Sequence, residues 1–185
     1  GEMRNVIPSE THEAYRRLYG EFASSGFHCA RTVLQKFDGL LSVNPRLLDA
    51  GSAFLGGMLF TGMTCSALTA GVMALGLRTG EIEGRWWRVL RMVFLILTGG
   101  PAFDDSVNRF NGPMNRGGEL AAWFAAQFGS TQCREITGAD FSSTAEVEKY
   151  LQGGGIARCR LIAQKVADRV QLAAGEGAAG HPARA

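Results

Sequence analysis

Apolar residues recur at helical spacing along almost the whole chain, and this periodicity constrains the possible folds more than any other feature. The first periodic segment follows Ser9, a suitable helix N-cap. Its apolar positions are Tyr15, Leu18, Tyr19 and Phe22. Glycine-rich segments separate the periodic stretches, and no stretch alternates as a β-strand does. The sequence therefore predicts an all-α fold, a compact multi-helix domain with glycine-rich loops between the helices.

Turn residues and capping residues define where the helices should begin and end. Asn44, Thr64 and Ser143 are the expected N-caps, and Ser143 forms a capping box with Glu146. Residues 104–116 contain turn-forming residues and are expected to be irregular. The expected helices cover residues 9–24, 27–37, 45 onward, 65–77, 84–98, 119–128, 144–151 and 156 onward.

The length of the chain predicts one domain with its own core. Its 185 residues are 46% hydrophobic, which is enough apolar surface to build one. We expect a single helical domain over residues 1–174, with an insertion at about residues 81–118. Residues 175–185 are rich in glycine and alanine and are expected to form a flexible tail.

Charge and hydropathy limit the expected partners and location. The net charge is +2 and the arginines are dispersed, which argues against a nucleic-acid partner. The most apolar run, residues 89–97, contains Arg91 and is shorter than the ~20 residues that a transmembrane helix needs. No apolar signal-peptide core lies near the N-terminus, so we expect a cytoplasmic protein. Because the chain starts at Gly1, a removed leader stays open as an alternative.

The chain has four cysteines, and no two of them are close in sequence. They are Cys29, Cys65, Cys133 and Cys159. The absence of a CxxC pair argues against a zinc ribbon, and four cysteines in a chain of this size do not form a secreted disulfide scaffold. In a reducing compartment this set favours metal binding or thiol redox chemistry at a site assembled by folding.

Helix positions should influence the cysteine thiols. Cys29, Cys65 and Cys159 fall at or near expected helix N-termini, where backbone N–H groups and the helix dipole stabilise a thiolate. Cys133 is expected in a turn beside Arg134, which favours the same charge. We therefore expect lowered thiol pKa values. The alternative is that they are small buried hydrophobic residues.

These cysteine segments resemble the C_GCAxxG_C_C family of redox-active proteins. The segments that carry the resemblance are residues 28–34, the glycine run that leads into residues 65–77, residues 128–138, and the helix that begins near Cys159. The resemblance covers most of residues 12–172. Ser66 and Ala70 stand where the family pattern has glycine, and both should narrow the approach of a neighbouring helix or cofactor.

The family is itself similar to the non-haem part of split-Soret cytochromes. The resemblance implies an iron–sulfur cluster, of the [2Fe–2S] type, held by Cys29, Cys65, Cys133 and Cys159. It implies electron transfer with an unknown redox partner, because no second catalytic constellation accompanies the thiols; whether the chain is an enzyme stays open. The lack of CxxCH argues against c-type haem. The alternatives are a thiol–disulfide oxidoreductase, a structural zinc protein with four cysteine ligands, or a protein without metal.

Other polar residues give weaker signals. His28 adjoins Cys29, and adjacent helix residues face different directions, so His28 is not expected to be a ligand. The remaining histidines and the candidate carboxylates are expected to be solvated. These residues are His12, His181, Asp104, Asp105 and Glu119. The double and triple glycines at residues 56–57 and 153–155 lack the lysine and strand of a phosphate-binding loop.

A tryptophan pair lies in the predicted helix over residues 84–98. Trp86 and Trp87 stand among three arginines, Arg85, Arg88 and Arg91. We favour a core or dimer-interface helix, which makes a homodimer an expected alternative to a monomer. A helix lying on a membrane surface, as in an accessory protein of a membrane complex, is the second interpretation.

Overall fold

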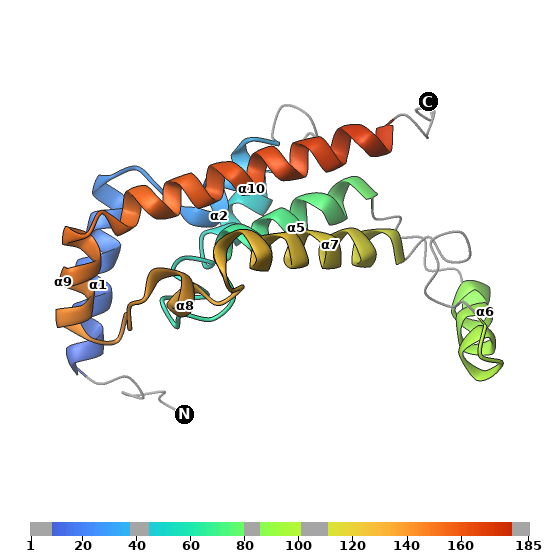
Figure 1. Ribbon diagram of the computed structural model, residues 1–185, viewed down its shortest axis with the longest axis horizontal. Helices are drawn as coiled ribbons and strands as arrows, with labels where there is room; N and C mark the ends of the chain where they lie inside the picture. Colours follow the sequence, from blue (N-terminus) through green and yellow to red (C-terminus); the bar gives the residue numbers. More distant parts are fainter. Residues whose placement is uncertain (1–8, 38–44, 80–85, 101–110, 179–185) are drawn as a thin grey trace.

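The computed structural model describes residues 9–37, 45–79, 86–100 and 111–178, and most of them are helical (Figure 1). The helices are α1 Ser9–Ser24, α2 Cys29–Gln35, α4 Pro45–Gly51, α5 Ser66–Thr79, α6 Trp86–Leu97, α7 Asn111–Phe128, α8 Cys133–Thr137, α9 Thr144–Gln152 and α10 Gly155–Ala178. Within these described residues the β-type pairing consists of an isolated bridge between Thr64 and Gln132. The all-α prediction is confirmed.

Helix α5 lies at the centre of the body. It packs against α2, α7 and α10, while α1 and α9 pack together at one end (Figure 1). A Cβ atom at Gly71 would lie 2.9 Å from both Leu120 Cδ2 on α7 and Val166 Cγ1 on α10. The absence of a side chain at this position therefore permits the close approach of three helices.

The core fills the space between these helices. Its largest fully buried side chains include Leu18, Leu34, Phe37, Leu75, Phe124, Val147, Val166 and Val170. Burial of each contributes about 1.5–3 kcal/mol relative to an exposed position. This core fixes the relative positions of α2, α5 and α10, which each carry or adjoin one of the cysteines.

Two predictions about irregular segments are corrected. Helix α7 begins at Asn111, so the second half of the segment predicted to be irregular is helical. The reason is that Pro113 lies in the first helical turn, where the backbone N–H groups have no intrahelical acceptor and proline is tolerated. Helix α10 continues to Ala178, into the predicted flexible tail. Asp104, Asp105 and His181 lie outside the described residues, whereas His12 and Glu119 are exposed.

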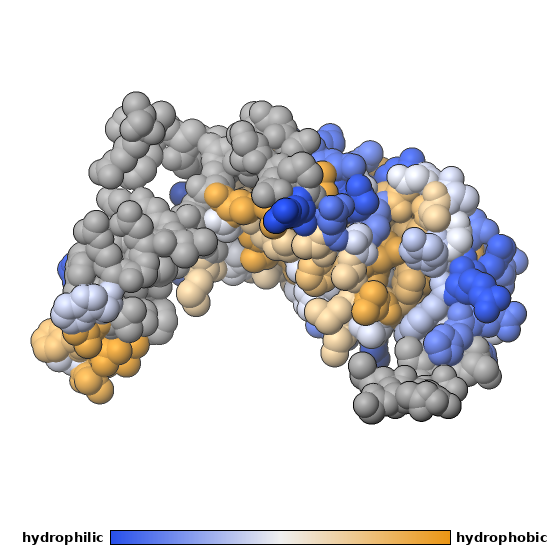
Figure 2. All heavy atoms as spheres, turned by 180° about the vertical axis from the view of Figure 1, so that it is seen from behind, coloured by the Kyte–Doolittle hydropathy of each residue, from blue (hydrophilic) through white to orange (hydrophobic). Residues whose placement is uncertain are grey.

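Helix α6 stands apart from the other helices in Figure 1. Trp86, Leu90, Phe94 and Leu97 are exposed, and Figure 2 shows apolar side chains gathered on this helix. The interpretation as a core helix is therefore wrong, while the dimer-interface and membrane-surface interpretations stay predictions. In the described part of the chain, no helix is both long enough and apolar enough to cross a bilayer.

Candidate cysteine site

The four cysteines line one cavity. Cys29 is the first residue of α2, Cys65 directly precedes α5, Cys133 is the first residue of α8, and Cys159 lies in α10. The other lining residues are Gly57, Ser66, Ala67, Ile136, Thr137 and Ile162. Folding thus gathers thiols from residues 29 to 159 of the chain around a common space.

The thiols are free, and they lie close enough to influence one another. No disulfide joins any of the four cysteines. After burial, the charges on Cys159, Cys65 and Cys133 are the main factors that raise the pKa of Cys29. Ionisation of one thiol would therefore be opposed by ionisation of the others.

The sulfurs line the cavity without converging on one point. Among the described residues, no group of three or more His, Cys, Asp or Glu side chains is placed so that it could hold a metal ion. The cavity offers about 10 Å³ of space for the centres of water molecules. That is roughly the space that one water needs. A larger occupant therefore requires the four side chains to move outward.

A left-handed turn between α4 and α5 forms one wall of the cavity. Residues 56–60 all have positive φ angles, with values between 54° and 70°. Three of these residues, Met58, Leu59 and Phe60, are not glycine, and the left-handed conformation costs roughly 1–2 kcal/mol for each of them. Hydrogen bonds hold the turn and the extended segment after it against α8. The backbone N–H of Cys133 donates to the Met63 carbonyl over 2.7 Å.

Gly57 allows this contact. A Cβ atom at Gly57 would lie 2.7 Å from both Cys133 Cβ and the Met63 carbonyl oxygen. Its backbone N–H donates to Ser66 Oγ over 3.1 Å. Ser66, which stands where the family pattern has glycine, therefore connects the left-handed turn to the start of α5 by a hydrogen bond.

Cys65 occupies the N-cap position of α5. The helix begins at Ser66, and the backbone N–H groups of Ala67 and Leu68 hydrogen-bond to the Cys65 thiol. This is the usual N-cap arrangement, with sulfur in place of oxygen. The prediction of Thr64 as the N-cap is wrong, because Thr64 instead forms the bridge to Gln132.

The positions of the other cysteines differ in part from the prediction. Cys29 begins a helix as expected. Cys133 also begins a helix, the short α8, rather than lying in a turn. Cys159 is not in the first turn of α10, because that helix begins at Gly155. It is half-buried, whereas the other three cysteines are buried.

The prediction of lowered thiol pKa values is wrong. Burial is the main cause that raises the pKa of Cys29, Cys133 and Cys159, and it raises the pKa of Cys65 from 9.0 to about 11. Backbone N–H groups act in the opposite direction, with Gly56 bonding to Cys29. The loss of hydration outweighs them, because an unpaired charge is costly to bury. The metal-free thiols are therefore protonated near neutral pH.

Tyr150 on α9 is a member of the site that sequence analysis missed. Its hydroxyl lies 3.2 Å from Cys159 Sγ, and its side chain is only 5% exposed. Burial and then the charge on Cys159 raise the pKa of Tyr150. The triple glycine after α9 was the available signal, because the ring occupies the space that a side chain at Gly155 would fill.

His28 is the N-cap residue of α2. The Arg31 backbone N–H donates to His28 Nδ1 over 3.3 Å, so Nε2 carries the proton and donates to the Ser52 carbonyl over 2.9 Å. Burial lowers the pKa of His28. The neutral ring is therefore the form that fits this position.

Replacing His28 should destabilise the fold modestly. We expect His28→Ala to lower the free energy of unfolding by about 1 kcal/mol, and His28→Asn to lower it less, because asparagine also caps helices. Because the pKa is lowered on folding, the contribution of His28 is complete above about pH 6.5 and is lost as the pH falls below it. Urea unfolding at pH 7 and pH 5 measures both effects. An equal pH dependence in wild type and His28→Asn would contradict this account.

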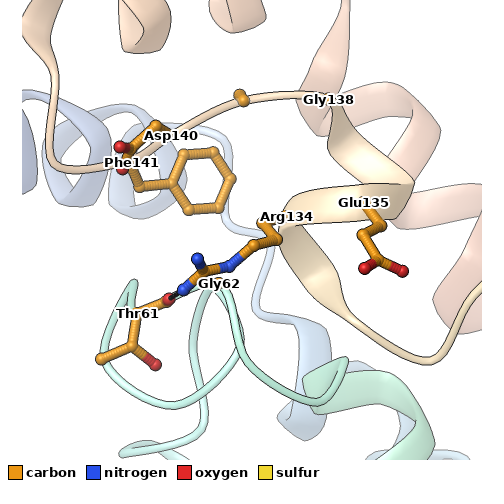
Figure 3. A pocket seen from close by; sticks show the side chains of 8 residues that line it. Thr61, Gly62, Arg134, Glu135, Gly138, Asp140 and Phe141 are labelled. Carbon is orange, nitrogen blue, oxygen red and sulfur yellow. Dashed lines mark hydrogen bonds between the residues drawn. The ribbon is translucent and has the colours of Figure 1, made fainter.

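A second pocket lies on the other face of α8. Its volume is about 350 Å³, and Figure 3 shows the Arg134 side chain directed toward Thr61, with the Phe141 ring nearby. Arg134 Nη2 donates to the Thr61 carbonyl over 2.8 Å. Arg134 was expected to favour the charged form of the Cys133 thiol. Its guanidinium instead hydrogen-bonds to the loop that follows the left-handed turn and so connects α8 to that loop. The remaining lining residues are Gly62, Glu135, Gly138 and Ala139.

Comparison with known proteins identifies the class. A family model described as "Putative redox-active protein (C_GCAxxG_C_C)" matches residues 27–172, which is most of the chain and includes all four cysteines. The chain belongs to this family of redox-active proteins. Neither the curated proteins nor the solved structures contain a match at the significance threshold.

Proposed function

We propose that Cys29, Cys65, Cys133 and Cys159 hold a [2Fe–2S] cluster and that the protein transfers electrons. The observation that carries this proposal is the lining of a single cavity by four free thiols. Among the residues that the structure describes, none with a carboxylate or imidazole group lines that cavity. An all-sulfur donor set suits iron–sulfur clusters, in which four thiolates serve as the ligands.

The surroundings of the sulfurs support the same proposal. Backbone N–H groups of Gly56, Ala67 and Leu68 hydrogen-bond to the Cys29 and Cys65 thiols. Hydrogen bonds of this kind stabilise the negative charge of bound thiolates and are one determinant of a cluster's potential. The left-handed turn that contains Gly56 keeps its backbone close to the site.

The chemistry that such a cluster supplies is one-electron transfer. The chain buries Cys29, Cys65 and Cys133 and leaves Cys159 half-buried as a residue. The side of the site at Cys159 is therefore the side from which a redox partner can approach most closely. Uptake also needs the four thiols to lose their protons, which their burial opposes until a cation compensates the charge.

Anaerobic reconstitution tests the proposal. Reduced protein is incubated with ferrous iron and sulfide, desalted, and analysed for iron, acid-labile sulfide and visible absorbance. We expect about two irons and two sulfides per chain. Each Cys→Ser variant should lose most of this content, whereas Thr137→Val, which changes a cavity-lining residue without removing a thiol, should keep it.

The alternatives give different results in the same samples. Protein with intact thiols that stays colourless and free of iron contradicts the proposal. Stoichiometric zinc without a redox response would favour a structural zinc site with four thiolate ligands. A disulfide formed by mild oxidation, detected by counting free thiols, would favour a thiol–disulfide oxidoreductase; that reaction requires two cysteines with Cα atoms under about 7 Å apart.

A further inference from the structure

We infer that Tyr150 is a positioning residue of the cysteine site, whose hydroxyl donates a hydrogen bond to the Cys159 sulfur and stabilises negative charge on it. The Oη–Sγ distance is 3.2 Å, and both groups lie at the junction of α9 and α10. The effect of Tyr150 on a reduction potential rests on the proposed function. The effect of Tyr150 on the metal-free Cys159 thiol is independent of the proposed function.

The packing of Tyr150 holds its hydroxyl in place. The ring makes an edge contact with Phe141 at a centroid distance of 5.2 Å. On its other side it fills the space above Gly155, where a Cβ atom would lie 2.1 Å from Tyr150 Cε2. The side chain is 5% exposed, so water does not compete for the hydroxyl. The glycine-rich segment at residues 153–155 thus leaves the space that the Tyr150 ring occupies.

The direction of the hydrogen bond follows from the chemistry of the two groups. A thiolate or a metal-bound cysteine sulfur has no proton, so in either state only the phenol can donate. A tyrosine hydroxyl carries its proton near neutral pH, so the phenol is available as the donor. Cys159 is also the half-buried member of the four. The donor therefore acts on the cysteine whose residue is the least buried of the four.

The first test uses metal-free, reduced protein. Site-resolved alkylation by iodoacetamide is compared in wild type, Tyr150→Phe and Tyr19→Phe, where Tyr19 is an exposed tyrosine that serves as the control. Loss of the donor should reduce the fraction of Cys159 that is thiolate about tenfold. The thiolate that remains is more nucleophilic, which raises its reaction rate about threefold and offsets part of that loss. We therefore expect Cys159 to react about threefold more slowly in Tyr150→Phe only. An unchanged or faster rate overturns the inference.

The second test uses reconstituted protein. Hydrogen bonds to ligand sulfurs stabilise the more negative, reduced state, so Tyr150→Phe should shift the midpoint potential downward. Gly155→Ala, which displaces the ring, should shift it in the same direction, and Tyr19→Phe should leave it unchanged. An unchanged potential in Tyr150→Phe overturns the inference while the proposed function stands. If wild type takes up no iron, the proposed function fails, and the alkylation rates alone decide the role of Tyr150.

Discussion

Metal-free protein is expected to lose several kcal/mol of unfolding free energy as the pH rises from about 9 to about 11. The folded state raises the pKa of all four cysteine thiols, and the pKa of Cys65 increases from 9.0 to about 11. A raised pKa means that the folded protein binds protons more tightly than the unfolded chain does. The resulting stability is complete below pH 9 and is lost as the pH rises through the folded pKa.

The magnitude follows from the shift at Cys65. Each pKa unit corresponds to ~1.36 kcal/mol, so Cys65 alone contributes about 3 kcal/mol, and the other three thiols act in the same direction. Urea unfolding of reduced protein at several pH values above 8 measures the loss. Cys65→Ala is the matched control, because it removes this one thiol and keeps all the other ionisable side chains of the chain. Equal pH dependence in both proteins would contradict the assignment.

Gly57→Ala is expected to destabilise the protein by about 3 kcal/mol and to impair formation of the cysteine site. Gly57 has a φ of +70°, which is unfavourable for alanine, and its new Cβ would lie 2.7 Å from Cys133 Cβ and from the Met63 carbonyl oxygen. The left-handed conformation costs roughly 1–2 kcal/mol, and overlap in a packed site costs about 1–3 kcal/mol. Because these contacts are with α8 and the segment paired to it, the substitution should displace Cys133 as well.

Thermal or urea unfolding measures the destabilisation, and reconstitution measures the loss of iron uptake. Gly20→Ala and Gly118→Ala are suitable controls. Both glycines lie in helices, neither has a positive φ, and a Cβ at either would meet nothing within 4 Å. Alanine should be neutral or stabilising there. Wild-type stability in Gly57→Ala would mean that the left-handed turn can rearrange at little cost.

The helical architecture was accessible from sequence because its signals are local. Apolar spacing predicted α1, α5 and α10, and a proline after Asn44 predicted the start of α4. The start of α7 was missed because asparagine, glycine and proline are typical both of a turn and of a first helical turn. Local composition alone does not distinguish these two conformations.

The candidate site could be predicted only in part. The four cysteines were expected to meet, and they line one cavity, but their role in holding a cofactor stays a prediction. The pKa direction was wrong because helix ends are local features, whereas burial depends on the whole fold. Tyr150 was missed for the same reason, since its contact with Cys159 depends on how α9 meets α10. The positive φ angles at Met58, Leu59 and Phe60 had no signal in the sequence, because these residues are not glycine.

If the proposed cofactor is bound, the wide spacing of the cysteines along the chain would place its uptake after folding. A pair of ligands within a short hairpin can capture a metal before the rest of a protein has folded. Here Cys29 and Cys159 belong to α2 and α10, which become neighbours only when the helical body is complete. A bound cofactor would then cross-link segments that are far apart in sequence, so that its removal would loosen the helical body as a whole.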